Sequence, residues 1–217
     1  MISFFAGLGL GLSLIIAIGA QNVFVLRQGI RREHVLVVVV ICALSDALLI
    51  TAGVAGLGIL LESMPWLVTA ARWLGAAFLL GYGILAARRA LRGGDATLHA
   101  DEGAAADAVP ATAPAASAAR LAPVIATALA LTWLNPHVYL DTVLMLGSIA
   151  ATHGEARWLF AGGAVIASVL WFTALGYGAR HLGRWLDTSR AWRILDGIIS
   201  VVMFALAVSL IAPVLTA

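Results

Sequence analysis

The sequence contains few charged residues, no lysine and a single cysteine. Charged residues make up 11% of the 217 positions and hydrophobic residues 62%, whereas about a quarter of a globular sequence is normally charged. A chain with so little polar surface cannot face water on all sides, which excludes a large soluble catalytic domain. The single thiol, Cys42, excludes disulfides within the chain and cysteine-based metal clusters.

The sequence contains six apolar runs that are each long enough to cross a membrane. Crossing the hydrocarbon core of a bilayer takes roughly 20 mostly apolar residues per helix. The runs are Phe4–Leu26, Val35–Leu61, Leu67–Ala87, Pro123–Ile149, Trp158–Ala179 and Leu195–Leu215. The sequence therefore predicts an all-α, polytopic membrane protein of about six transmembrane helices, with residues 1–217 forming a single membrane domain.

The basic residues indicate how these helices are oriented. Eleven of the thirteen fall in three of the five connections, namely Arg27, Arg31 and Arg32, then Arg88, Arg89, Arg92 and Arg120, then Arg180, Arg184, Arg190 and Arg193. By the positive-inside rule the first, third and fifth connections face the cytoplasm. Six spans then place both termini outside, whereas five spans or a re-entrant first segment place the N-terminus inside. This clustering argues against a nucleic-acid partner, which a net charge of +2 alone would allow.

The longest connection, Gly93–Ala119, divides the chain into repeat 1 (residues 1–92) and repeat 2 (residues 120–217). It has no aromatic residue and cannot bury enough apolar surface to fold, so we expect a flexible cytoplasmic linker. Residues of one type recur in both halves at similar offsets: Ser45 and Ser168, Gly53 and Gly176, Asn22 and Asn135, Gly75 and Gly197. The recurrence predicts two inverted three-helix repeats, which in transporters place the substrate site near the bilayer midplane.

Two acidic residues interrupt the apolar runs, Asp46 in the second and Asp141 in the fourth. An ionisable group in the hydrocarbon region costs about 2.5–3.5 kcal/mol on insertion scales and marks a substrate or ion path. One alternative is that each carboxyl stays protonated and donates a hydrogen bond to a neighbouring helix. The functional alternative is an aqueous cavity that holds a guanidinium or ammonium group. Burial favours the neutral acid and a nearby cation favours the charged one, so cargo and proton can compete for one site.

The fourth run also contains a helix break at Pro136. Proline removes a backbone donor and clashes with the preceding turn, which frees carbonyls near Thr132 and Trp133. In a membrane these carbonyls must meet protein or water, and Asn135 can supply hydrogen bonds there. The candidates for lining a cavity are His137, Tyr139 and Trp133. For His137 a packing role competes with a proton relay, and for Trp133 packing competes with stacking on a guanidinium.

A pair of amides, Gln21 and Asn22, interrupts the first run after Gly19 and Ala20. Such a pair can hydrogen-bond the carboxylate of an amino acid or satisfy a broken backbone. Hydrogen bonding between helices explains the pair nearly as well.

These motifs resemble the lysine/arginine exporter family (LysE/ArgO type). The resemblance is carried by Gly19–Asn22, Arg27–Arg32, Ser45-Asp46 and Leu131–Thr142, and it extends over nearly the whole chain outside Gly93–Ala119. It looks most like the arginine-exporting branch. The resemblance implies a secondary transporter of the bacterial inner membrane that exports L-arginine, with L-lysine as a second substrate, and is driven by the proton gradient.

The resemblance also assigns roles to single residues. The positions that match the family's motifs are Gln21, Asn22, Asp46, Asn135, Pro136 and Asp141. The five polar residues are implied to bind substrate or couple protons, and Pro136 to break the helix. The family usually has proline where this chain has Ala20, so we expect a milder break in the first span.

Several other functions remain as alternatives. Export of a neutral amino acid or a divalent cation is compatible with two acids and several amides, and a membrane scaffold is a further possibility. An enzyme is disfavoured, since the sequence has neither an HExxH pair nor a GxSxG elbow. No cofactor and no metal site are predicted, and a homo-oligomer is left open.

Overall fold

The computed structural model describes the chain except for residues 18, 59–62, 93–112, 183–187 and 216–217. Most of the segment expected to be a linker, Gly93–Ala119, therefore lies outside the described residues, and its flexibility stays a prediction. The described part is helical, with no strand among these residues. The prediction of an all-α protein is confirmed.

The helices fall into two series along the chain. The first consists of α1 (Ile2–Ile15), α2 (Ala20–Arg31), α3 (Val35–Ala52) with a π-helical turn at Gly53–Leu57, and α5 (Pro65–Arg92). The second consists of α6 (Ala113–Trp133), α7 (Pro136–Val138), a π-helical segment at Tyr139–Met145, α8 (Leu146–Ala151), a 3-10 turn at Gly154–Ala156, α9 (Arg157–Leu182) and α10 (Ser189–Leu215). Each series is a broken helix followed by two long ones. An inverted symmetry between them stays a prediction.

Four helical segments are long and apolar enough to cross a membrane: Val35–Leu57, Thr69–Leu91, Gly154–His181 and Arg190–Ala212. Two bent pairs, α1 with α2 and Leu121–Trp133 with Pro136–Ala151, bring the number to six if each pair is one span. The predicted polytopic architecture is thus confirmed. The first and fourth spans consist of two shorter helices each, because a break interrupts them.

The break in the first span is sharper than expected. The angle between α1 and α2 is 82°, against 54° at the break that contains Pro136. The expectation of a milder first break, drawn from the missing proline at Ala20, is therefore wrong. Gly19 is in extended backbone (φ −126°, ψ 166°), and the Asn22 amide nitrogen donates to the carbonyls of Ile15 (2.8 Å) and Ala17 (2.9 Å). Because this amide satisfies carbonyls at the end of α1, the break needs no proline.

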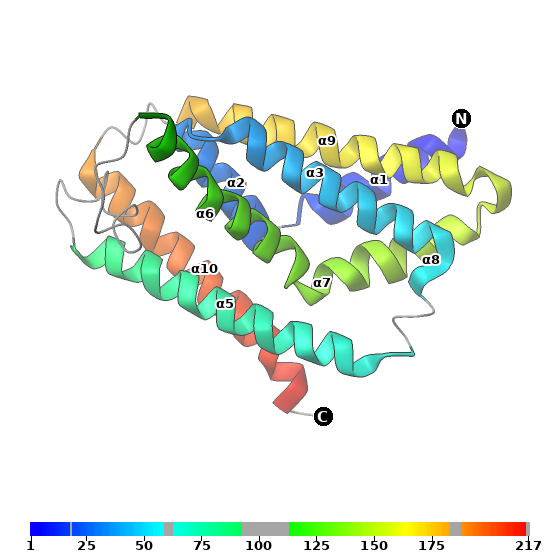
Figure 1. Cartoon of the computed structure of the whole chain (residues 1–217). Helices are drawn as coiled ribbons and strands as arrows, with labels where there is room; N and C mark the ends of the chain where they lie inside the picture. Colours follow the sequence, from blue (N-terminus) through cyan, green and yellow to red (C-terminus); the bar gives the residue numbers. More distant parts are fainter. Residues whose placement is uncertain (18, 59–62, 93–112, 183–187, 216–217) are drawn as a thin grey trace.

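The arginine-rich ends of the helices gather at one end of the bundle (Figure 1). The last turns of α2, α5 and α9 and the first turns of α3, α6 and α10 lie there, whereas the N-terminus and the start of α9 lie at the other end. Along the bundle α10 packs against α5, and α9 packs against α1, α2 and α3. The two broken helices come together between these layers.

The contact between α1 and α9 is a contact of backbones. A Cβ atom at Gly7 would lie 1.9 Å from the Phe160 carbonyl oxygen, and one at Gly163 would lie 2.0 Å from the Phe4 carbonyl oxygen. Glycines allow membrane helices to approach this closely.

Gly75 on α5 makes a similar approach to the second break. A Cβ atom there would lie 2.1 Å from the Leu134 carbonyl oxygen, while one at Gly81, on the same helix, would meet no described atom within 4 Å. Gly197, which the sequence pairs with Gly75, also has no described atom within 4 Å of its Cβ position. This one recurrence between the halves therefore has no counterpart in packing.

We expect Gly75→Val to destabilise the protein and to displace the second break. Forcing extra methyl groups into a packed site typically costs about 1–3 kcal/mol, and here the obstacle is a backbone carbonyl. Gly81→Val is the matched control, because it makes the same change on the same helix in open space. The measurement is the midpoint of thermal unfolding in detergent. Equal midpoints for the two variants would contradict the close approach of Gly75 to Leu134.

Candidate functional site

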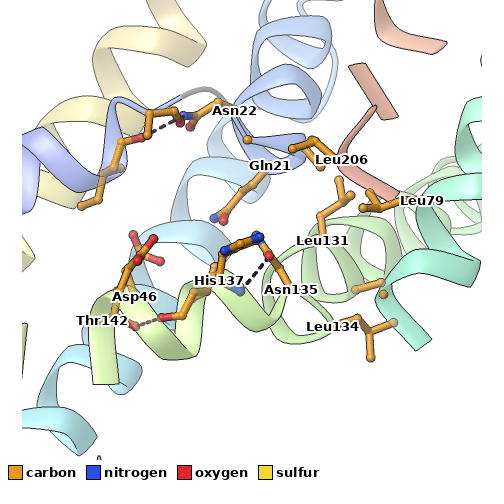
Figure 2. Close-up of a pocket in the computed structure, with 18 of the residues that line it drawn as sticks. Gln21, Asn22, Asp46, Leu79, Leu131, Leu134, Asn135, His137, Thr142 and Leu206 are labelled. Carbon is orange, nitrogen blue, oxygen red and sulfur yellow. Dashed lines mark hydrogen bonds between the residues drawn. The ribbon is translucent and has the colours of Figure 1, made fainter. Parts of the chain in front are cut away.

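A cavity of about 230 Å³ lies where the two broken helices meet. Its polar lining residues are Gln21, Asn22, Asp46, Asn135, His137, Asp141 and Thr142, and its apolar lining comes from α1, α5, α6, α9 and α10. Pockets for drug-sized ligands run to about 300–1,000 Å³, so this cavity suits a small solute. Figure 2 shows side chains from both breaks facing the same space.

Asp46 enters the cavity from α3. The residue is only 4% exposed, and its Oδ2 accepts a hydrogen bond of 2.7 Å from the Ser168 hydroxyl on α9. No described residue donates to its other oxygen, Oδ1. The carboxyl group is therefore held in place by one bond, with one oxygen left to interact with a ligand.

Asp141 enters the same cavity from the π-helical segment Tyr139–Met145. Wide turns of this kind are frequent at functional sites, because they change the direction in which side chains project. Its carboxyl group is half-buried, and within the described ranges it accepts no hydrogen bond. The next residue, Thr142, donates its hydroxyl to the Val138 carbonyl one turn earlier.

The second break is completed by side chains on both sides of it. Pro136 is buried at the first position of α7, and the Asn135 side-chain oxygen accepts from the His137 backbone N–H at 3.1 Å. The Tyr139 hydroxyl donates to the Trp133 carbonyl at 2.7 Å, and the Asn135 N–H reaches the Thr132 carbonyl at 3.4 Å. The carbonyls that proline frees therefore meet protein, as the sequence predicts.

The cavity contains most of the residues singled out in the sequence. Those that line it are Gln21, Asn22, Asp46, Asn135, His137 and Asp141. Trp133 and Tyr139, which we expected as candidate lining residues, are not part of the lining. Trp133 is partly exposed and donates its indole N–H to the Ser45 hydroxyl at 3.2 Å, and the Tyr139 hydroxyl bonds to the backbone at the break. Pro136 lies behind the lining and sets the shape of the break.

Sequence reasoning missed the apolar wall and two polar members of the site. The wall includes Phe78, Leu79, Leu131, Phe172, Leu206 and Leu210. In apolar helices these residue types give no signal, because they face lipid, core or cavity alike. Ser168 was noticed only as a repeat match, and Thr142 only as part of a motif.

A second polar cluster lies near the arginine-rich end, outside the cavity lining. Nη2 of Arg27 lies 3.3 Å and Nε of Arg89 lies 3.4 Å from the same oxygen, Oδ1 of Asp196. Arg27 also donates to the Tyr82 hydroxyl at 3.3 Å. These charged groups link α2, α5 and α10. In the sequence, both arginines served only to predict the orientation of the helices. Asp196 could have been singled out because it is an acid near the start of an apolar run.

No group of three or more His, Cys, Asp or Glu side chains among the described residues is placed to hold a metal ion. Cys42 is fully buried on α3.

Comparisons with known proteins agree on one family. A family model described as LysE type translocator matches residues 12–213. The chain is 46% identical over 197 residues to the "Putative amino-acid transporter" of Mycobacterium tuberculosis (strain H37Rv), covering 91% of this chain and 90% of the relative. It is 41% identical over 222 residues to the lysine exporter LysE of Corynebacterium efficiens (96% and 97% covered). It is 43% identical over 213 residues to the arginine exporter protein ArgO of Salmonella schwarzengrund (97% and 94% covered). No solved structure matches the chain.

Proposed function

Because the chain belongs to the LysE type translocator family, we propose that it exports cationic amino acids, L-arginine and also L-lysine, across the bacterial inner membrane. The relatives named as lysine and arginine exporters support this substrate class. The transport is secondary and is coupled to the proton gradient.

One observation carries the proposal: two carboxyl groups from different helices line a single cavity. Asp46 comes from α3 and Asp141 from the segment after α7, and no arginine is among the residues that line the cavity in the described part of the chain. A buried carboxylate and a half-buried one without a cation beside them are unfavourable. A guanidinium or ammonium group supplies the missing positive charge, and its N–H groups donate hydrogen bonds to the carboxylates.

The same two groups provide a physical basis for proton coupling. When the cation leaves, uptake of a proton by a carboxylate removes the uncompensated charge from the apolar surroundings. When the next cation enters, it displaces the proton. Cargo and proton therefore occupy the site in turn, which couples outward movement of one to inward movement of the other.

The asparagines act on this site through the breaks. Asn22 holds the end of α1 and Asn135 caps the start of α7. Both side chains fix helix ends that border the cavity.

The proposal is tested by counterflow in proteoliposomes with a panel of labelled solutes. We expect exchange of L-arginine and L-lysine, and background signals for L-leucine and for a divalent cation. An acidic exterior should accelerate the release of preloaded arginine. Exchange of leucine without exchange of arginine would contradict the proposed substrate class. Release rates that do not depend on the pH gradient would contradict proton coupling and leave the substrate class standing.

A further inference from the structure

The two helix breaks are completed in different ways. At the second break the start of α7 is capped, since the Asn135 side chain accepts from the His137 N–H. At the first break the residue before α2 is Gly19, which has no side chain to serve as a cap. The nearby Asn22 donates its amide nitrogen to carbonyls of the preceding segment instead.

The start of α2 therefore presents backbone donors to the cavity. The first helical hydrogen bond of α2 runs from the Val23 N–H to the Gly19 carbonyl at 3.2 Å, so the N–H groups of Ala20, Gln21 and Asn22 precede it. No described residue accepts from these three groups, and all three residues line the cavity. A helix N-terminus carries roughly half a positive charge and binds anions such as carboxylates.

The Gln21 side chain points to the same kind of ligand. The residue is 8% exposed, and its Nε2 atom is buried without a hydrogen-bond partner in the described part of the chain. Buried donors without a partner are rare and call for an acceptor. The Cys42 thiol lies beside this amide, but sulfur is only a weak acceptor. Figure 2 shows the Gln21 side chain extending from α2 into the space that Asp46 and Asn135 also face.

We propose that the start of α2, together with Nε2 of Gln21, is the subsite that binds the α-carboxylate of the exported amino acid. The inference rests on the proposed function, because it assigns the second charged group of the same cargo. The negative group of the cargo meets the donors of α2, and its positive side chain meets Asp46 and Asp141. The transporter thereby selects amino acids over the amines that their decarboxylation yields.

Agmatine tests this selection directly, since it keeps the guanidinium group of arginine and lacks the carboxylate. Wild-type protein in proteoliposomes is assayed for inhibition of labelled-arginine counterflow by unlabelled arginine, agmatine and arginine methyl ester. We expect agmatine and the ester to compete at least about tenfold more weakly than arginine, which corresponds to the loss of hydrogen bonds to a charged group. This measurement needs no variant.

Two variants then locate the subsite. Gln21→Leu should weaken the apparent affinity for arginine about tenfold, by loss of a hydrogen bond to a charged group, and leave inhibition by agmatine unchanged. Gln28→Leu is the matched control, because Gln28 lies on the same helix with the same 8% exposure but does not line the cavity. It should keep the preference for arginine.

The outcomes separate this inference from the function on which it rests. If agmatine competes as well as arginine, the carboxylate subsite is refuted while export of cations stands. If Gln21→Leu weakens arginine and agmatine equally, Gln21 acts only on the fold and the assignment is overturned. If the wild type exchanges no arginine at all, the proposed function itself has failed.

Discussion

Replacing Asp46 with asparagine should reduce arginine export roughly 30-fold or more, since removing one partner of a buried, hydrogen-bonded charge pair costs about 2–5 kcal/mol. Asparagine has nearly the same shape, and its side-chain oxygen can still accept the bond from Ser168. The change therefore removes the charge and leaves the packing of α3 against α9. The measurement is the initial rate of labelled-arginine counterflow at equal amounts of inserted protein.

Asp141→Asn should lower the rate as well, because this carboxyl lines the same cavity. Its loss should be smaller than that of Asp46→Asn, since Asp141 is only half-buried and water screens its charge more. Glu155→Gln, in the exposed turn before α9, provides a control for removal of an acid away from the cavity. Normal export by both cavity variants would refute the binding of cationic cargo by these carboxylates.

The second large effect is expected at Asp196. Asp196→Asn removes the carboxylate that the buried Arg27 and the partly buried Arg89 share. Breaking a buried ion pair by removal of one partner destabilises proteins by about 3–5 kcal/mol. We therefore expect a lower midpoint of thermal unfolding in detergent, measured as the loss of the monodisperse size-exclusion peak after heating.

Arg89→Gln serves as the comparison for Asp196→Asn. It keeps the contact between Arg27 and Asp196, whose side chains are each 8% exposed, so its loss of stability should be smaller. The ranking of the two variants tests whether the acid is the centre of the cluster. An unchanged midpoint for Asp196→Asn would show that this cluster does not hold α2, α5 and α10 together.

The architecture was predictable because the bilayer constrains it strongly. A helix must supply enough apolar residues to cross the hydrocarbon core, and polar residues there are costly, so both the spans and the acids stand out in the sequence. Asp46 and Asp141 were found for this reason. That they share one cavity depends on two breaks folding against each other, which a single sequence does not show.

The angle of the break in the first span could not be predicted from the local sequence. The missing proline at Ala20 predicts a milder break, yet the angle is 82°. The sharp turn is stabilised by Asn22, whose side chain reaches back to carbonyls seven and five residues earlier. Whether an amide bonds to its own backbone or to a neighbouring helix is decided by the fold, so its presence alone could not predict the angle.

Contacts between segments far apart in the chain could not be predicted from the sequence for the same reason. Ser168 meets Asp46 across 122 positions, and Arg89 meets Asp196 across 107. Each residue has several potential partners in the sequence. The apolar wall of the cavity was hidden in a different way, since leucines of α5 and α10 are indistinguishable in sequence from those that face lipid.

The contact of the α1 and α9 backbones at Gly7 and Gly163 limits how the cavity can open. Sliding one helix along the other would bring the Cβ atom of a neighbouring residue against a carbonyl, so we expect the two helices to move together. If the chain transports as proposed, we expect the hinges at the interruption between α1 and α2 and at the one before α7, where no continuous helix has to be bent.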